Sequence, residues 1–407
     1  MTAPLAGIRV LDLSRVLAGP WCTQTLADLG AEVIKIERPG AGDDTRSWGP
    51  PFARDAAGDQ TSESAYFLSA NRGKKSVTVD MADRQGQRII RALAEKCDVL
   101  VENFKVDGLK KYGLDYASIS KLNPRLIYCS ISGFGQTGPY RDRPGYDFMI
   151  QALGGLMSIT GEPDGKSGGG PVKVGVAVAD LFSGLYATVG VLAALNGRAV
   201  SGRGEHIDVS LFDVQVAMLA NQSLNYLTSG VSPARLGNAH PNIVPYEAFK
   251  TADGHIVLAV GNDAQFARFC ECAGNPELSN DAKFSTNPER VKHRAALVPI
   301  VAALMQKQTT AWWLEHLNAA GVPCGPVNTI ADVFADEQVQ ARGLKLDLPN
   351  AAAGTVPSVA SPLVFGHTRH SAASGPPTLG EHTGDVLSRM LDLSAAELAD
   401  LRAAKVI

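Results

Sequence analysis

The first forty residues alternate between strand and helix patterns, and this alternation restricts the chain to a small set of folds. Apolar residues run through 8–13 and again through 32–36, and a helix is expected over 19–29 between them. A strand, a helix and a second strand in this order form a βαβ unit, whose strands lie parallel and whose crossover is right-handed. The sequence therefore predicts a parallel sheet at the start of the chain.

The alternation continues to about residue 225, where the composition changes to a Gly-, Pro- and Asn-rich segment over 230–246. We predict an α/β fold with a large domain over 1–225, a smaller α+β domain over 226–325 and a C-terminal segment over 326–407. The further strands are expected over 98–101, 126–132, 172–178, 206–211 and 255–260, and the further helices over 84–97, 115–122, 263–273, 288–305, 310–319 and from Ser394.

Composition excludes several classes of function. A net charge of −3 over 407 residues provides no general attraction for nucleic acid or an anionic membrane. The six cysteines form no CxxC pair, and the amino-terminal residues lack the pattern of a secretory signal. The longest apolar stretch is interrupted by Asp180 and by glycines, which leaves it too short for a membrane-spanning helix. We expect a cytoplasmic protein with neither a nucleic-acid nor a membrane partner.

Asp180 is the only charged side chain between Val174 and Gly197. The sequence places it at the junction of the strand expected over 172–178 and a following helix. Free backbone N–H groups and the helix dipole would keep such a carboxylate ionised, and an ionised, partly desolvated carboxylate can act as a nucleophile. The alternative is structural, because Asp is also a favoured helix N-cap.

Other motifs point to side-chain binding of a phosphorylated ligand. The GxGxxG match at 133–138 is followed by Pro139 instead of a helix, which argues against a dinucleotide site, and neither Walker motif is present. His367/His370 and Cys270/Cys272 are the only close metal-type pairs, and we expect no metal site. Basic residues recur near predicted strand ends, where ligands bind in open α/β sheets. They are Arg15, Lys35, Arg38, Arg46, Arg72, Lys74, Lys75, Lys105, Lys110, Lys111 and Arg143.

Several segments carry a family resemblance, and they follow one another in family order from end to end of the chain. They are 12–20, 30–39, 101–104, 113–114, 123–128, 132–140, Ala179-Asp180, 202–204 and 379–383. Together they resemble the class III coenzyme A transferases of the CaiB/BaiF type, the family that includes formyl-CoA transferase.

The resemblance implies a Rossmann-like large domain built from both chain ends, a smaller inserted domain and an interlocked homodimer. It implies that Asp180 is the nucleophile of a CoA transfer from an acyl-CoA to a carboxylic acid. The intermediates would be an aspartyl anhydride and an aspartyl–CoA thioester. Coenzyme A is then a substrate, and no permanently bound cofactor is expected.

The resemblance also assigns binding residues. Leu17 stands where formyl-CoA transferase has a glutamine, and the segment 237–246 resembles members that use succinyl-CoA and dicarboxylic acids. We therefore expect succinyl-CoA as donor and a dicarboxylate as acceptor. The substrate positions are Leu17, Tyr146, Arg235 and His240, and the CoA contacts are Val16, Ala18, Arg38, Lys75, Asn103, Phe104 and Lys111.

Two other functions fit the same motifs. An α-methylacyl-CoA racemase shares the family features, but it needs an acid and a base on opposite faces of the α-carbon. Racemases of the family use a Gly-His-Asp segment, whereas this chain has Gly145-Tyr146-Asp147, and tyrosine is a poor base at neutral pH. The other alternative is a CoA-binding protein without catalysis, which would not need Asp180.

Overall fold

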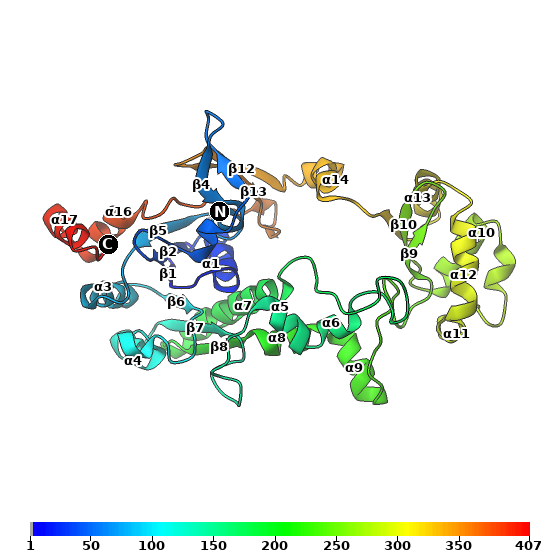
Figure 1. Ribbon diagram of the computed structural model, residues 1–407, viewed down its shortest axis with the longest axis horizontal. Helices are drawn as coiled ribbons and strands as arrows, with labels where there is room; N and C mark the ends of the chain where they lie inside the picture. The colour runs from blue at the N-terminus through cyan, green and yellow to red at the C-terminus, as the bar shows by residue number, and fades with distance from the viewer. Residues whose placement is uncertain (1–2) are drawn as a thin grey trace. The chain divides into compact units, whose positions relative to one another are not determined.

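A computed structural model describes residues 3–407 as two compact units (Figure 1). The first unit contains 3–155, Val174–Ser223 and Glu337–Ile407, and the second contains Leu156–Lys173 and Leu224–Asp336. The second unit thus takes up a short segment before residue 174 that the sequence analysis placed in the large domain, and it continues eleven residues beyond the expected boundary at 325.

The first unit is built on a six-stranded sheet with the order β5-β2-β1-β6-β7-β8, and all neighbouring strands are parallel. The predicted parallel sheet is confirmed. The chain begins in the middle of the sheet, so the loops after β1 and β6 leave in opposite directions. Ligands bind at such a switch point in open α/β sheets. The strands are β1 (Arg9–Asp12), β2 (Glu32–Glu37), β5 (Lys74–Thr78), β6 (Val99–Glu102), β7 (Ile127–Ser132) and β8 (His206–Ser210).

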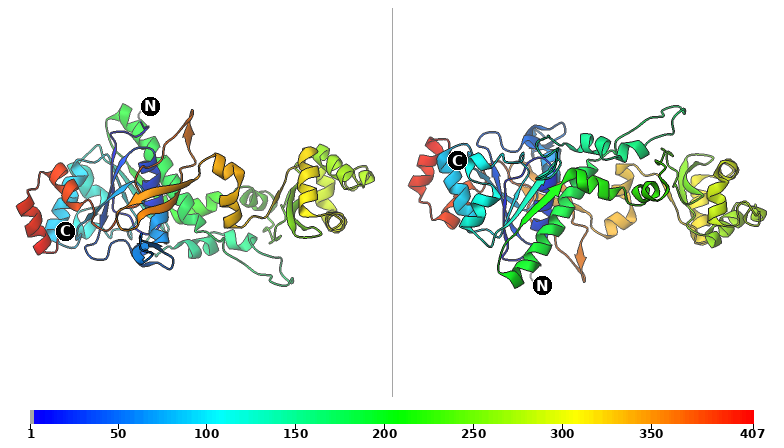
Figure 2. Two further views of the ribbon diagram at one scale, coloured as in Figure 1. Left: turned by 90° about the horizontal axis from the view of Figure 1, so that it is seen from above. Right: turned by 90° about the horizontal axis from the view of Figure 1, so that it is seen from below.

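Successive residues of each strand point to opposite faces of the sheet and fill two cores. In β1, Val10 belongs to one buried cluster and Leu11 to the other. Figure 2 shows the red helices of the carboxyl end beside the blue and cyan segments whose core they share, so this unit uses both ends of the chain. One face is covered by α1 (Ala18–Asp28), α5 (Asp147–Leu153), α7 (Val178–Ser201) and α8 (Leu211–Met218), the other by α3 (Arg84–Glu95), α4 (Tyr116–Leu122), α16 (Thr383–Leu391) and α17 (Ala395–Ala403).

The strand expected over 172–178 is wrong. The chain there is irregular until Val178, which begins α7. The Val172 N–H donates to the carbonyl oxygen of Thr160, and side chains of α5 bind two other N–H groups at the entry to α7. Val174 donates to the side chain of Gln151, and Ala179 donates to the carboxylate of Asp147. Alternating Val and Gly residues imitate a strand pattern, but no partner strand pairs with them.

Helix α7 is longer than the sequence suggested. Among residues 3–407 it alone is long and apolar enough to cross a membrane by length and composition, and 33% of its most apolar window is buried. The expectation of a shorter stretch was wrong because its glycines continue the helix and allow close packing. A Cβ on Gly184 would lie 2.6 Å from the carbonyl oxygen of Ala18, so α7 lies directly against α1. The other side of α7 exposes Phe182, Leu185, Tyr186 and Val189.

Shorter elements surround this framework in the first unit. They are η1 (Asp44–Ser47), β3 (Phe52–Arg54), β4 (Gln60–Ser64), α2 (Ala65–Ser69), η2 (Lys110–Tyr112), α15 (Glu337–Ala341), β12 (Lys345–Asn350), β13 (Gly354–Val359), β14 (Val364–Phe365) and β15 (Thr368–Arg369).

The second unit has its own core around an antiparallel sheet with the order β11-β10-β9. Trp313 and Phe269 are central to this core, and the Trp313 indole donates to the carbonyl oxygen of Met305 at 2.8 Å. Its elements are α6 (Leu156–Ile159), α9 (Ala220–Ser229, which begins in the first unit), β9 (Tyr246–Lys250), β10 (His255–Ala259), α10 (Asp263–Cys272), η3 (Pro276–Ser279), α11 (Asn287–Lys292), α12 (Arg294–Met305), α13 (Thr310–Ala319), β11 (Cys324–Pro326) and α14 (Ile330–Ala335).

Candidate active site

The loop between β1 and α1 holds a strained backbone. Val16 has φ +70°, a left-handed conformation that costs a β-branched residue roughly 1–3 kcal/mol. Its N–H lies 3.3 Å from both carboxylate oxygens of Asp43. The preceding Arg15 donates its N–H to the side chain of Asn103 at 2.8 Å and accepts from the same amide at 2.6 Å. Contacts from two other loops therefore fix Val16.

Two fully buried lysines lie beneath this loop. The Lys35 Nζ is 2.9 Å from the carboxylate of Asp43, and the Lys74 Nζ is 3.1 Å from that of Asp12. Although burial by itself raises the pKa of Asp43, the charge of Lys35 lowers it to about 2. Burial lowers the pKa of Lys74 to about 8. Both lysines were suggested as phosphate contacts by the sequence, but their ammonium groups are enclosed and already paired.

A cavity of about 500 Å³ opens at the carboxyl ends of β1, β6 and β7. It brings together residues that are far apart in the sequence, and eight of the twelve predicted site residues line it. Those eight are Val16, Leu17, Ala18, Asn103, Phe104, Lys111, Tyr146 and Asp180.

Asp180 lies in the wall of this cavity as the third residue of α7. The helix N-cap is Ala177, so the capping alternative is wrong. No group within residues 3–407 donates a hydrogen bond to its carboxylate. Burial raises the pKa of Asp180 to about 7, and the charge of Asp147 adds to this effect. The expectation that helix N–H groups hold this carboxylate ionised is therefore also wrong.

Asp147 is a candidate site residue to which the sequence analysis gave no role. It begins α5, accepts a hydrogen bond from the Ala179 N–H at 2.8 Å and accepts another from the side chain of Gln151 at 2.7 Å. Asp147 thus fastens the first turn of α7 while its charge opposes ionisation of Asp180. The signal in the sequence that could have found Asp147 is its position directly after Tyr146, which the sequence analysis had named as a substrate residue and which lines the cavity.

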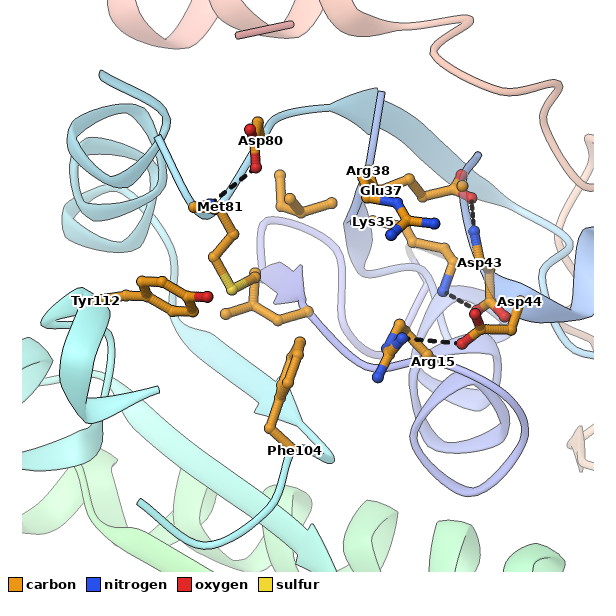
Figure 3. A pocket seen from close by; sticks show the side chains of 14 residues that line it. Arg15, Lys35, Glu37, Arg38, Asp43, Asp44, Asp80, Met81, Phe104 and Tyr112 are labelled. Atoms are coloured by element: carbon orange, nitrogen blue, oxygen red, sulfur yellow. Dashed lines mark hydrogen bonds and ion pairs between the residues drawn. The ribbon is translucent and has the colours of Figure 1, made fainter. Parts of the chain in front are cut away.

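A second cavity of about 310 Å³ shares Arg15, Asp44, Phe104 and Tyr112 with the first. Half of its fourteen lining residues are charged, but the surface exposed inside it is mostly apolar, and we call it the apolar cavity. Figure 3 shows the rings of Phe104 and Tyr112 and the side chain of Met81 around one side of it, with Arg38 across from them. The two cavities together form a continuous lining from Arg38 to Asp180.

The remaining predicted CoA contacts differ in position. Arg38 lines the second cavity, as just described. Lys111 lines the first cavity, and its Nζ lies 4.6 Å from the centre of the Tyr112 ring. Lys75 lines neither of the two cavities. It lies on β5, and its Nζ pairs with the carboxylate of Glu32 at 2.9 Å.

Two predicted substrate residues belong to the second unit, whereas the cavities belong to the first. The guanidinium of Arg235 pairs with Asp164 and donates to the carbonyl oxygen of Ser158. The ring of His240 lies 5.2 Å from that of Tyr246, and burial lowers the pKa of this histidine, which favours its neutral form at pH 7.

The GxGxxG segment forms a turn and opens no helix. Gly135 and Gly138 both have positive φ, and the Gln136 N–H donates to Asp208 at 2.9 Å. Gly133 approaches Gly145 so closely that a Cβ on it would lie 2.6 Å from the Gly145 Cα. Within residues 3–407 there is no group of three metal-ligating side chains.

Comparisons with known proteins agree with this geometry. A model of CoA-transferase family III matches residues 5–383. A succinate–glutarate CoA-transferase of Agrobacterium fabrum is 51% identical over 387 residues, which cover 95% of this chain and 96% of the relative. A succinyl-CoA:glutarate CoA-transferase of Mus musculus is 46% identical over 405 residues, covering 99% and 90%. A CaiB/BaiF family protein of Brucella suis has a crystal structure with a TM-score of 0.83 and 48% identity, covering 96% of this chain and 100% of that one.

The chain belongs to CoA-transferase family III, and it is an enzyme of that family. The resemblance read from the sequence motifs is confirmed.

Proposed function

We propose that this enzyme transfers coenzyme A from succinyl-CoA to glutarate, with Asp180 as the covalent nucleophile. The observation that carries the proposal is a carboxylate without a hydrogen-bond donor in the wall of an elongated double cavity. The choice of acids is supported by the relatives named for succinate, succinyl-CoA and glutarate over nearly the whole chain.

The reaction begins when the ionised carboxylate of Asp180 attacks the thioester carbonyl of succinyl-CoA. The C–S bond breaks, which leaves a mixed anhydride and a CoA thiolate. The thiolate attacks the aspartyl carbonyl, releases succinate and forms an enzyme–CoA thioester. Glutarate attacks this thioester and displaces the thiolate, and the thiolate then attacks the glutaryl carbonyl of the new anhydride. Glutaryl-CoA leaves and Asp180 is regenerated, so each step replaces one acyl bond with another.

A weakly solvated carboxylate suits this chemistry. Water and hydrogen-bond donors stabilise a carboxylate anion and reduce its reactivity, and Asp180 has no donor among the described residues. Its raised pKa still leaves about half of the molecules ionised near neutral pH. The neighbouring carboxylate of Asp147 opposes ionisation in the resting enzyme, and this repulsion disappears once Asp180 carries an acyl group.

CoA fits the double cavity as an extended chain. The adenine would occupy the apolar cavity beside Phe104 and Tyr112, where a flat ring gains most from aromatic contact. The pantetheine would then run through the larger cavity towards Asp180, and the diphosphate would lie near Lys111, whose charge suits it. Arg15 also lines this path, but its guanidinium is paired with Asp44 at 2.9 Å.

Racemisation is the less favoured activity. It needs an acid and a base on opposite faces of the α-carbon, with at least one near neutral pKa. No histidine lies among the described residues that line the larger cavity. Of the two carboxylates that line it, Asp44 is paired with Arg15 at 2.9 Å, which leaves Asp180 without an opposing acid or base.

We also propose a homodimer, supported by the apolar residues that α7 exposes. Monomeric proteins rarely leave such a row of large apolar side chains on one helix in contact with water. Light scattering of the purified protein should give twice the mass of the 42.9 kDa chain. A monomer at micromolar concentration would contradict this part of the proposal.

The activity is tested in heavy water with succinyl-CoA and a pool of carboxylic acids, and the thioesters are followed by mass spectrometry. We expect glutaryl-CoA without deuterium at the α-carbon, and none from the Asp180→Asn variant. An α-methyl thioester that gains deuterium while no acyl group moves would replace the transferase proposal with the racemase. Transfer to another acid in the pool would retain the mechanism and correct the acceptor.

A further inference from the structure

A third cavity, of about 210 Å³, shares part of one loop with the larger cavity. The shared residues are Lys105, Val106 and Gly108, and the rest of the lining comes mainly from β6, β7, β8 and the start of α4. Neither Asp180 nor any of the predicted CoA contacts lines this third cavity. The loop is therefore a wall common to two cavities, and groups in the third cavity can affect the shape of the larger one.

Three polar side chains form a hydrogen-bonded row across the sheet in the third cavity. Glu102 ends β6 and lies opposite Ser130 of β7 in the strand register. The Ser130 hydroxyl is hydrogen-bonded to the Glu102 carboxylate, and its Oγ lies 2.9 Å from Nε2 of His206, the first residue of β8. The ring of His206 is stacked on that of Tyr116 with 4.6 Å between their centres. The row thus joins three neighbouring strands and is fixed at its far end by an aromatic contact.

The near end of the row is attached to the loop of residues 103–109. The Glu102 carboxylate accepts a hydrogen bond from the Phe104 N–H at 2.8 Å. The ring of Phe104 lines both the larger and the apolar cavity (Figure 3). At the other end of the loop, Leu109 is buried in the core of the first unit. Glu102 therefore fixes the place where the loop leaves the sheet and, with it, an aromatic ring of the proposed substrate path.

Glu102 is buried without a cation. The residue is 7% exposed, and no cation among residues 3–407 forms an ion pair with its carboxylate. Burial raises the pKa of Glu102 to about 7 against the hydrogen bonds from Ser130 and Phe104, and the charge of Asp208 adds to the rise. A glutamine would make the same two contacts without the cost of burying an ionisable group. This cost points to a function for the carboxyl group itself.

The row has two proton arrangements. When Glu102 is ionised, the Ser130 hydroxyl donates to it and accepts from the Nε2–H of His206. When Glu102 is protonated, its O–H donates to Ser130, whose hydroxyl donates to Nε2 of His206. Both arrangements use a neutral His206, and burial lowers the pKa of this histidine. In the ionised arrangement the bond from the Phe104 N–H is charge-assisted and therefore stronger.

Other charged or titratable groups line the same cavity or act on Glu102 and His206. They are Lys105, Asp107, Asp115, Tyr116, Tyr128 and Asp208. Asp107 is paired with Arg141, so its charge is already compensated.

We propose that Glu102, supported by Ser130 and His206, is a positioning residue that holds the loop 103–109 in the conformation that accepts the CoA thioester. The proposal rests on the function above, because it takes the larger cavity as the place where the thioester binds. Glu102 lines neither cavity of the substrate path and acts through the Phe104 N–H. The anchor is strongest above pH 7, where Glu102 is ionised, and weakens as the pH falls.

Steady-state kinetics with succinyl-CoA and glutarate and titration calorimetry with CoA test the role of Glu102. Losing a hydrogen bond to a charged group changes affinity by roughly 10- to 100-fold. At pH 8 we expect Glu102→Ala to raise the KM for succinyl-CoA and the Kd for CoA by that factor and to leave kcat unchanged. Glu102→Gln keeps an oxygen acceptor for the Phe104 N–H and should restore most of the affinity. The control Glu95→Ala removes an exposed glutamate of α3 and should change neither constant.

The pH dependence distinguishes the carboxylate from an amide of the same shape. The Kd for CoA is compared between Asp180→Asn and Asp180→Asn/Glu102→Gln, because the first substitution removes the other carboxyl group with a pKa near 7. The ratio of the two Kd values cancels the ionisation of CoA itself. We expect the double variant to bind progressively more weakly than the single variant from pH 6 to pH 8, because only the carboxylate gains charge over that range.

The outcomes separate the two proposals. Unchanged KM and Kd in Glu102→Ala overturn the role of Glu102, and so does a Kd ratio that is the same at every pH. A loss of kcat together with KM in both the Ala and the Gln variant also overturns it, because that loss reflects a disturbed sheet. In each of these cases, transfer by the unaltered enzyme leaves the proposed function standing. An unaltered enzyme that neither binds CoA nor transfers it rejects the proposed function, and the role of Glu102 with it.

Discussion

Replacing Asp180 by Asn should abolish transfer and at the same time stabilise the protein, by an amount that grows with pH. Asn has nearly the same shape but never ionises. The pKa of Asp180 rises from 3.8 to about 7 on folding, chiefly through burial and further through Asp147. Each pKa unit corresponds to about 1.4 kcal/mol, so ionised Asp180 destabilises the folded state by up to about 4 kcal/mol.

The sign and the pH window follow from which state holds the proton more tightly. Below pH 3.8 both states are protonated at this position, so the destabilisation is absent. Between 3.8 and about 7 only the unfolded state releases the proton, and stability falls as pH rises. Above 7 the effect is constant. The gain from the Asp180→Asn substitution should be about 2 kcal/mol at pH 5 and about 4 kcal/mol at pH 8.

Calorimetric unfolding of both proteins at pH 5, 6.5 and 8 measures this difference. The control is Asp142→Asn, which removes a carboxylate whose side chain is 84% exposed. Its effect should be small and independent of pH. A gain from Asp180→Asn that is the same at all three pH values would refute the raised pKa. A loss of stability would show that the carboxylate supports the helix end.

Three further outcomes are expected. The transfer rate at low substrate concentration should rise about tenfold per pH unit up to pH 7 and then level off, because the attack needs ionised Asp180. Initial rates measured across this pH range test the profile. Asp147→Asn removes the charge that opposes this ionisation, so the midpoint of the same rate profile should move to lower pH. Asp43→Ala leaves Lys35 buried without its carboxylate and should lower the free energy of unfolding by about 3–5 kcal/mol, measured by urea unfolding.

The parallel sheet and the helices of the second unit could be predicted from the sequence because burial leaves a local pattern. Apolar residues recur every second position in strands and every three to four in helices. The helix expected over 310–319 is α13 with those bounds, and the strand expected over 255–260 is β10 within one residue. Asp180 was found for a related reason, since one charge in an otherwise apolar stretch is itself a local signal.

The features that the sequence did not disclose depend on contacts between distant residues. Asp147 is 33 positions from Asp180, and only folding brings its charge near that carboxylate. The left-handed Val16 depends on Asp43, and nothing in the residues beside Val16 signals it. Lys75 was assigned as a CoA contact from the family resemblance, but it lies on the edge strand β5 and its side chain pairs with Glu32.

The paired charges beneath the Val16 loop have a consequence for how the sequence can evolve. Asp12, Lys35, Asp43 and Lys74 have fully buried side chains, and each neutralises another across two or more strands or loops. Losing any one leaves its partner charged inside the protein, whereas exchanging a whole pair for apolar residues can be nearly neutral. A single substitution at any of these positions should therefore destabilise the protein and be rejected during evolution. Related sequences should either keep each pair intact or have lost both members together.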